Sequence, residues 1–137
     1  ERRATNAKLR VATPKDEGTC FTVVENVERK GVAEIASEIE GEQTDVPENE
    51  SECVLTLYTS GTVGGEGTTP VAEDGDEAGL AVGEVRRRPS VVDEQVVAAY
   101  TVPMSVSFDP ASVDGTDCAR FLEYLRSYVE EPARMLL

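Results

Sequence analysis

The most constraining feature of this chain is a long strand followed directly by an amphipathic helix, in residues 94–131. Residues 94–108 predict the strand, because apolar and polar side chains alternate over its second half with the period of a half-buried strand. The alternating residues are Met104, Ser105, Val106, Ser107 and Phe108. Residues 109–112 then predict a turn between this strand and the helix.

Residues 114–131 predict the helix, because their apolar side chains recur at three- and four-residue spacing and share one face. These residues are Cys118, Phe121, Leu122, Leu125 and Val129. Asp114 or Thr116 can cap the first turn, and Pro132 marks the end. A single apolar stripe requires another surface to cover it, which predicts a helix packed on a sheet.

The length and composition predict one domain with a modest core. The chain has 137 residues, no Trp and only 5% aromatic residues, so Val, Leu, Ala and Ile must fill most of the interior. No apolar run approaches the roughly 20 residues that span a bilayer, and no signal-peptide pattern is present. We therefore expect a soluble protein with no membrane partner.

The net charge of −14 comes from the middle of the chain. No Lys or Arg lies between Lys30 and Arg86, while 14 of the 27 acidic residues lie in that interval, and the remaining 13 balance the 13 basic residues. Adaptation to high salt would spread acids over the whole surface. The pattern favours solvated acidic loops, with an acidic partner-facing surface as the alternative.

The reactive residue types indicate neither catalysis nor metal binding. Cys20, Cys53 and Cys118 cannot all pair within one chain, and each occupies an apolar position, which favours buried free thiols over an intersubunit disulfide. The chain contains no His, the commonest metal ligand and general base. We therefore expect no enzyme, no cofactor and no metal site.

The remaining pattern predicts several strands before the helix, an α+β plan. Two strands at residues 8–13 and 20–27 can form a hairpin through residues 14–18. Residues 31–39 are compatible with either a short strand or a helical turn. Further expected segments are a loop at 40–50, a strand at 52–59, a long acidic and Gly-rich connection over 60–79 and a strand at 80–85.

Two stretches in this order resemble the coat proteins of single-stranded RNA phages (leviviruses). The first runs from Cys20 through a Val-rich strand into Gly31-Val32-Ala33, within residues 20–37. The second, within residues 97–125, has Val-Ala-Ala-Tyr, an apolar strand, a turn, Thr116-Asp117-Cys118 and the helix. The family usually has a short turn where this chain has residues 61–79, so the resemblance implies that these residues are an insertion.

The resemblance implies a fold for the whole chain, with residues 1–137 as one coat-protein domain. It comprises an N-terminal hairpin (about 6–27), an antiparallel five-stranded sheet (about 32–108) and a helical C-terminus (about 114–137) that packs on a dimer partner. The implied dimer interface consists of Phe121, Leu122, Leu125 and Val129.

The resemblance also implies a function: a capsid protein whose dimers assemble into an icosahedral shell around single-stranded RNA, in a virion formed in the bacterial host cytoplasm. The implied RNA contacts, which in the family include a repressor hairpin, are Thr56, Tyr58, Arg86 and Arg88. Glu52 departs from the family's positive charge and Pro103 falls near its stacking aromatic. These departures leave open a sheet face without an RNA site. The alternative function is an acidic stand-alone binding domain from a high-salt organism.

Overall fold

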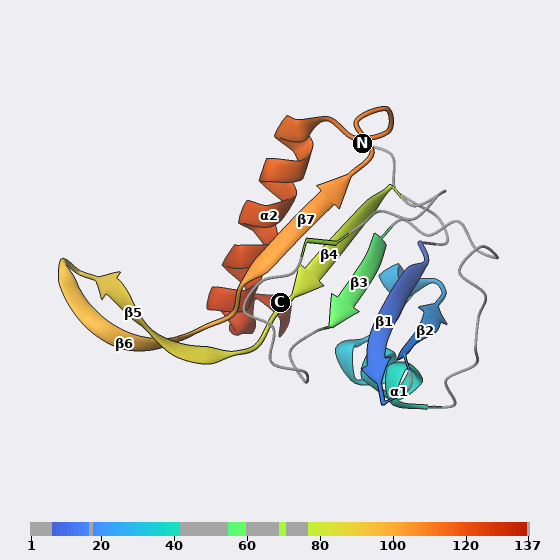
Figure 1. Ribbon diagram of the computed structural model, residues 1–137, viewed down its shortest axis with the longest axis horizontal. Helices are drawn as coiled ribbons and strands as arrows, with labels where there is room; N and C mark the ends of the chain where they lie inside the picture. Colours follow the sequence, from blue (N-terminus) through green and yellow to red (C-terminus); the bar gives the residue numbers. More distant parts are fainter. Residues whose placement is uncertain (1–6, 17, 42–54, 60–68, 71–76, 137) are drawn as a thin grey trace.

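A five-stranded sheet forms the body of the described part of the chain (Figure 1). The computed structural model describes residues 7–16, 18–41, 55–59, 69–70 and 77–136. The strand order across the sheet is β2-β1-β3-β4-β7. The strands are β1 (Leu9–Lys15), β2 (Gly18–Val24), β3 (Leu55–Thr59), β4 (Ala78–Val82) and β7 (Met104–Phe108).

The sheet is mixed, so the prediction of an antiparallel coat-type sheet is wrong. β1 pairs antiparallel with β2, in a register from Leu9–Val24 to Lys15–Gly18, and β4 pairs antiparallel with β7. The central pairs β1–β3 and β3–β4 are parallel. Parallel neighbours need long crossover connections, and the connection that leads from β2 to β3 contains the helix α1 (Val32–Glu40). The ambiguous segment 31–39 is therefore helical.

Residues 94–108 form two strands in two different sheets, although their sequence predicts a single strand. β6 (Gln95–Thr101) pairs with β5 (Arg86–Val92), and β7 joins the main sheet. The break falls at Pro103, whose ring nitrogen has no proton for a strand ladder. Its carbonyl oxygen instead accepts a hydrogen bond from the backbone N–H of Gly83 at 2.9 Å.

We call the hairpin of β5 and β6 the arm (residues 86–101). Its two-residue turn is Asp93-Glu94, with φ of 50° and 62°, the left-handed pair that matches the twist of a tight hairpin. The arm projects away from the main sheet (Figure 1).

The predicted C-terminal helix is present as α2 (Gly115–Glu130). The Asp114 carboxylate accepts a hydrogen bond from the backbone N–H of Thr116 at 3.0 Å, and a 3₁₀ helix, η2 (Pro132–Leu136), follows directly. α2 packs beside β7 of its own chain (Figure 1), whereas the coat-type arrangement would place it on a partner. A short 3₁₀ helix, η1 (Val27–Arg29), lies between β2 and α1.

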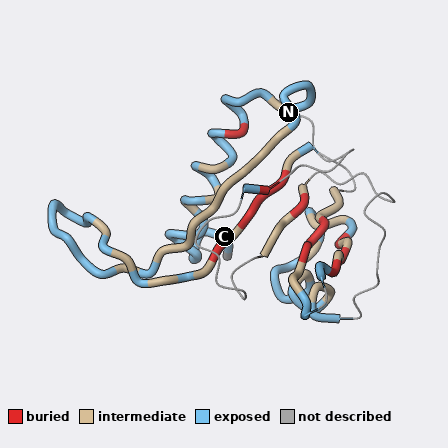
Figure 2. Tube along the Cα trace, in the orientation of Figure 1, coloured by how far each residue is buried: buried red, intermediate tan, exposed pale blue. Residues whose placement is uncertain are grey.

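The core lies on strands β1, β2 and β4, with one residue of α2 (Figure 2). Its buried apolar residues are Val11, Ala12, Cys20, Val24, Leu80, Ala81 and Cys118. Cys20 and Cys118 are free thiols, as predicted, and Cys53 lies outside the described residues. So do residues 42–50 of the predicted loop and most of residues 61–79. No helix in the described part of the chain is long and apolar enough to cross a membrane.

Candidate functional site

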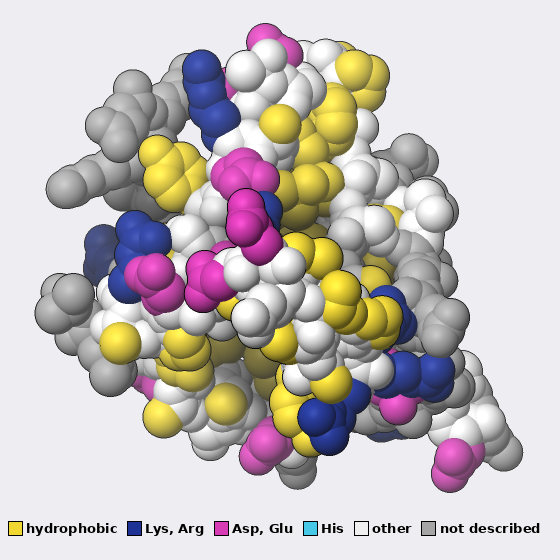
Figure 3. All heavy atoms as spheres, turned by 90° about the vertical axis from the view of Figure 1, so that its left-hand side faces the viewer, with side chains coloured by type: hydrophobic (Ala, Val, Ile, Leu, Met, Phe, Trp, Pro, Cys, Tyr) yellow, Lys and Arg dark blue, Asp and Glu magenta, His cyan; other side chains and the backbone are white. Residues whose placement is uncertain are grey.

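A groove lies between α2 and the chain segment that links β6 to β7. Its volume is about 690 Å³. Apolar side chains from both elements line it, and hydrophobic side chains gather over this side of the molecule (Figure 3). The apolar lining comprises Tyr100, Val102, Met104, Leu122 and Val129. The groove can therefore hold a hydrocarbon chain or apolar side chains of another protein.

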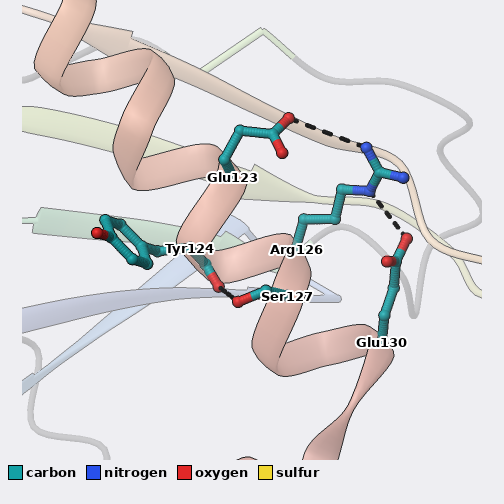
Figure 4. Close-up of polar contacts among 5 residues, drawn as sticks. All are labelled: Glu123, Tyr124, Arg126, Ser127 and Glu130. Carbon is teal, nitrogen blue, oxygen red and sulfur yellow. Dashed lines mark hydrogen bonds and ion pairs between the residues drawn. The ribbon is translucent and has the colours of Figure 1, made fainter.

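An ion triad on α2 forms the charged rim of this groove. The Arg126 guanidinium lies 2.9 Å from a Glu130 carboxylate oxygen and 3.9 Å from one of Glu123 (Figure 4). The hydrogen bond to Glu130, followed by the charges of Glu130 and Glu123, raises the pKa of Arg126 above its ordinary value. The Arg126 side chain is exposed, and exposed ion pairs contribute little stability, so we assign the triad an orienting role along the helix.

A second hollow, of about 580 Å³, lies on the outer face of α2. Arg120 and Arg134 contribute to its lining, together with the exposed ring of Tyr124. The Arg134 guanidinium lies 5.3 Å from the centre of the Tyr128 ring. Arg120 is paired with Asp117 at 3.1 Å and Glu123 also lines this hollow, so acidic and basic groups are mixed beside its aromatic surface.

The loop between β7 and α2 carries two carboxylates that hold the backbone in place. The Asp109 side chain accepts hydrogen bonds from the N–H of Ala111 at 2.9 Å and the hydroxyl of Ser112 at 3.2 Å. Asp114 caps α2. Both carboxylates thus have structural partners, and neither belongs to a nucleophile–base pair among the contacts of the described residues.

The four residues predicted to contact RNA lie in two different sheets. Thr56 is completely buried in β3, and Tyr58 is half-buried in the same strand. Arg86 and Arg88 lie in the arm, where Arg86 pairs with Glu84 at 2.6 Å. The structure does not bring these four side chains together.

The four residues predicted to form a dimer interface share one side of α2. Phe121 and Val129 are exposed, whereas Leu122 and Leu125 are half-buried. Leu122 and Val129 also line the groove beside α2. Their contact with a partner chain stays a prediction.

Sequence comparison assigns the chain to an enzyme family. Residues 2–137 match the family model of the 2-oxoacid dehydrogenases acyltransferase (catalytic domain). The match covers nearly the whole chain, and the chain therefore belongs to this family.

Curated relatives include the dihydrolipoyllysine-residue acetyltransferase components of the pyruvate dehydrogenase complexes of Bacillus subtilis and Staphylococcus epidermidis. The Bacillus protein is 30% identical over 135 residues, which cover 93% of this chain and 30% of the relative. The Staphylococcus protein is 28% identical, with 93% and 31% covered. The chain thus spans just under a third of the length of these relatives.

Solved structures show the same fold. A probable dihydrolipoamide acetyltransferase from Listeria monocytogenes superposes with a TM-score of 0.82 at 21% identity, covering 95% of this chain and 58% of that one. The Azotobacter vinelandii dihydrolipoamide acetyltransferase gives 0.82 at 23%, covering 98% and 58%. The cubic core of a pyruvate dehydrogenase multienzyme complex gives 0.78 at 22%, with the same coverage.

These findings overturn the levivirus resemblance and what it implied. The relatives are enzymes of cellular pyruvate dehydrogenase complexes, so the capsid function, the RNA genome as partner and the virion location are wrong. The alternative of an acidic stand-alone binding domain finds no support either. Strand, turn and amphipathic helix in this order specify local structure only, and unrelated α+β folds share that order.

The prediction that the chain is not an enzyme is also wrong, since its relatives are acetyltransferases. That prediction rested on the missing His. The study of the Azotobacter enzyme addresses the role of a serine, a histidine and an asparagine in its catalytic mechanism. This chain contains no histidine. A missing residue type therefore did not identify the class of protein.

The groove beside α2 was missed for a different reason. Its helical half is recognisable in the sequence, because Glu123, Arg126 and Glu130 have the three- and four-residue spacing of ion pairs on one helix. Its other half comes from the segment around Val102, which the sequence presents as the interior of a strand.

Proposed function

We propose that this chain is an acyltransferase that exchanges an acyl group with a dihydrolipoyl-lysine residue in a 2-oxoacid dehydrogenase complex. The family match over residues 2–137 carries the proposal. The acetyltransferase names of the relatives supply the acyl group and its carrier.

The chemistry is transfer of an acyl group between two sulfur atoms. The acceptor thiolate attacks the thioester carbonyl carbon and forms a new C–S bond, and the donor C–S bond breaks to release a thiolate that takes up a proton. The acceptor thiol must lose its proton before or during the attack, because the thiolate is the nucleophile. A histidine is the side chain that most often removes such a proton.

This chain has no imidazole for that step. Among the described residues, Asp109 and Asp114 make hydrogen bonds that hold the loop and cap α2. The proton can leave by ionisation of the acceptor thiol itself, or it can pass to an imidazole from outside these 137 residues. Free thiols ionise at about pH 8.5 and imidazoles at about 6.5, so the two mechanisms predict different pH profiles.

The test measures acetyl transfer from a small acetyl thioester to free dihydrolipoamide between pH 6 and 9, with urea-unfolded chain as the control. We expect transfer above the rate with unfolded chain. A rise of about tenfold per pH unit up to roughly pH 8.5 would indicate ionisation of the thiol itself, and an inflection near 6.5 would indicate an imidazole.

One result would contradict the proposal, and another would separate the two mechanisms. A rate equal to that of unfolded chain at every pH would remove the acyltransferase function. Transfer with an inflection near pH 6.5 would keep the function but reject self-ionisation of the thiol. A series of acceptor thiols of decreasing pKa gives a second readout, because the rate at pH 7 should rise as more of the acceptor is ionised.

A further inference from the structure

One serine in the described part of the chain follows a run of arginines. Ser90 lies in β5, and Arg87 and Arg88 precede it by three and two residues. No other described serine or threonine has arginine at both of these positions. Arginine-directed protein kinases select their substrates by this charge pattern, because carboxylates in their substrate cleft pair with guanidinium groups. The sequence therefore marks Ser90 as an acceptor for a phosphoryl group.

The conformation around Ser90 suits binding in an extended cleft. β5 is extended from Arg86 to Val92, and within the described residues its ladder is with β6 alone, along one of its two edges. The arm projects away from the main sheet (Figure 1). Ser90 is half-buried, but a two-stranded hairpin is only marginally stable in water and opens readily. An enzyme that binds an extended peptide can therefore reach the Ser90 hydroxyl.

Arg88 supplies a binding group for a phosphoryl group at Ser90. Side chains two residues apart in a strand lie on the same face, about 7 Å from each other along the chain. The Nη2 atom of Arg88 is buried and has no hydrogen-bond acceptor among the described residues. A buried donor without an acceptor costs free energy, and a new acceptor beside it removes that cost.

The two arginines before Arg88 are occupied differently. The Arg86 guanidinium is paired with the Glu84 carboxylate at 2.6 Å. Arg87 points to the opposite face of β5, where its guanidinium lies 5.8 Å from the centre of the Tyr100 ring. Arg88 is therefore the arginine of this run that can accept a new anionic partner at Ser90.

We propose that Ser90 is phosphorylated by an arginine-directed protein kinase and that Arg88 binds the attached phosphoryl group. The Ser90 Oγ attacks the γ-phosphorus of a magnesium-bound nucleoside triphosphate and forms a new O–P bond. The bond from that phosphorus to the β-phosphate oxygen breaks, the nucleoside diphosphate leaves, and a carboxylate of the kinase takes the hydroxyl proton. The product presents negative charge and three acceptor oxygens, which favour a charge-assisted hydrogen bond from a guanidinium.

Phosphorylation of the folded chain tests the site. The chain is incubated with magnesium ATP and the catalytic subunit of cyclic-AMP-dependent protein kinase, an arginine-directed enzyme, and the product is mapped by mass spectrometry. Thr5 also follows two arginines and lies outside the described residues, so every chain in the test carries Thr5→Ala. We expect one phosphoryl group, located at Ser90, and none after Ser90→Ala.

The arginine variants test recognition by the kinase. Arg87→Gln and Arg88→Gln should each lower kcat/KM for phosphorylation by about tenfold or more, since each removes a charged hydrogen bond to the kinase cleft. Arg120→Gln is the matched control, because this exposed arginine pairs with Asp117 on α2, away from the arm, and its loss should leave the rate unchanged. Far-UV circular dichroism verifies that every variant is folded.

A ³¹P NMR titration of the phosphorylated chains tests the contact with Arg88. The second ionisation of phosphoserine has a pKa of about 6, and a neighbouring guanidinium favours the doubly charged form. The pKa should therefore be about 0.5 unit lower with Arg88 present than after Arg88→Gln, which is phosphorylated by longer incubation. Arg87→Gln is the control, since Arg87 lies on the opposite face of β5 and its loss should leave the pKa unchanged.

Three results would overturn the inference. Absence of phosphate from Ser90 in the folded chain removes the modification site. Equal kcat/KM for the unchanged chain and both arginine variants shows that the arginines do not direct the kinase. Equal phosphoserine pKa values with and without Arg88 remove its role as the binding group. None of these measurements uses acyl transfer, so this proposal and the proposed function can fail independently.

Discussion

The backbone N–H of Gly83 donates a hydrogen bond to the carbonyl oxygen of Pro103 at 2.9 Å, and this bond joins the two ends of the arm. One residue further into the sheet, Val82 is paired with Met104. The chain thus leaves β4 for the arm and returns from it directly into β7, and the arm takes no part in the β4–β7 ladder. The main sheet and the arm are separate units joined at this point.

This arrangement predicts that the arm can be removed without loss of the sheet. Replacing residues 84–102 by a four-residue Gly-rich turn should keep the free energy of unfolding within about 2 kcal/mol of the intact chain, because halving a connection changes its closure cost by only about 0.6 kcal/mol. Urea unfolding measured by circular dichroism tests this. A shortened chain that no longer folds would show that the arm stabilises the main sheet.

Removing the hydrogen bond that caps the first turn of α2 should lower the free energy of unfolding. The Asp114 carboxylate accepts a hydrogen bond from the Thr116 N–H. Asp114→Ala leaves that donor without its partner and should lower the free energy of unfolding by about 1 kcal/mol. Asp114→Asn keeps an acceptor oxygen and is the matched control. Equal destabilisation by both changes would indicate that the charge, rather than the cap, is what matters.

The centre of the sheet should be the position most sensitive to loss of side-chain volume. Leu80 is 5% exposed and is paired with Leu57 on one side and Val106 on the other. Leu80→Ala should lower the free energy of unfolding by about 2–5 kcal/mol, since it removes buried methyl groups and leaves a cavity.

Val32→Ala is the control for this change. Val32 is 73% exposed on α1, so its truncation should alter the free energy of unfolding by no more than about 0.5 kcal/mol. Chemical denaturation of both variants gives the comparison. Similar values for the two would mean that the core lies elsewhere in the chain.

Local sequence determined the elements whose signals lie within a few residues. The capping carboxylate of Asp114, the apolar spacing from Cys118 and the stop at Pro132 were sufficient for α2. Alternation between Met104 and Phe108 was sufficient for β7. In both cases the hydrogen bonds or the shared face are set by neighbours in the chain, so the sequence pattern contains the physical cause.

Tertiary structure alone decided how these elements are joined. Alternation places Thr56 and Tyr58 on a face of β3, but it does not say that parallel neighbours on both sides leave Thr56 completely buried. Nor does the apolar run from Gln95 to Phe108 reveal that its halves enter two sheets. The sequence shows Pro103 as a residue that interrupts a strand ladder. The change of sheet at this point depends on the hydrogen bond from the Gly83 N–H, twenty residues earlier in the chain.

The physical reason is the symmetry of the strand. A strand presents N–H and C=O groups along both edges, so its own sequence does not choose between parallel and antiparallel partners. Closure of a longer connection costs little extra free energy, so distance along the chain does not choose either. Burial of side chains from distant parts of the chain makes that choice. For this reason a local pattern resembled a coat protein, while the fold matches that of a dihydrolipoamide acetyltransferase structure and the sequence belongs to the acyltransferase family.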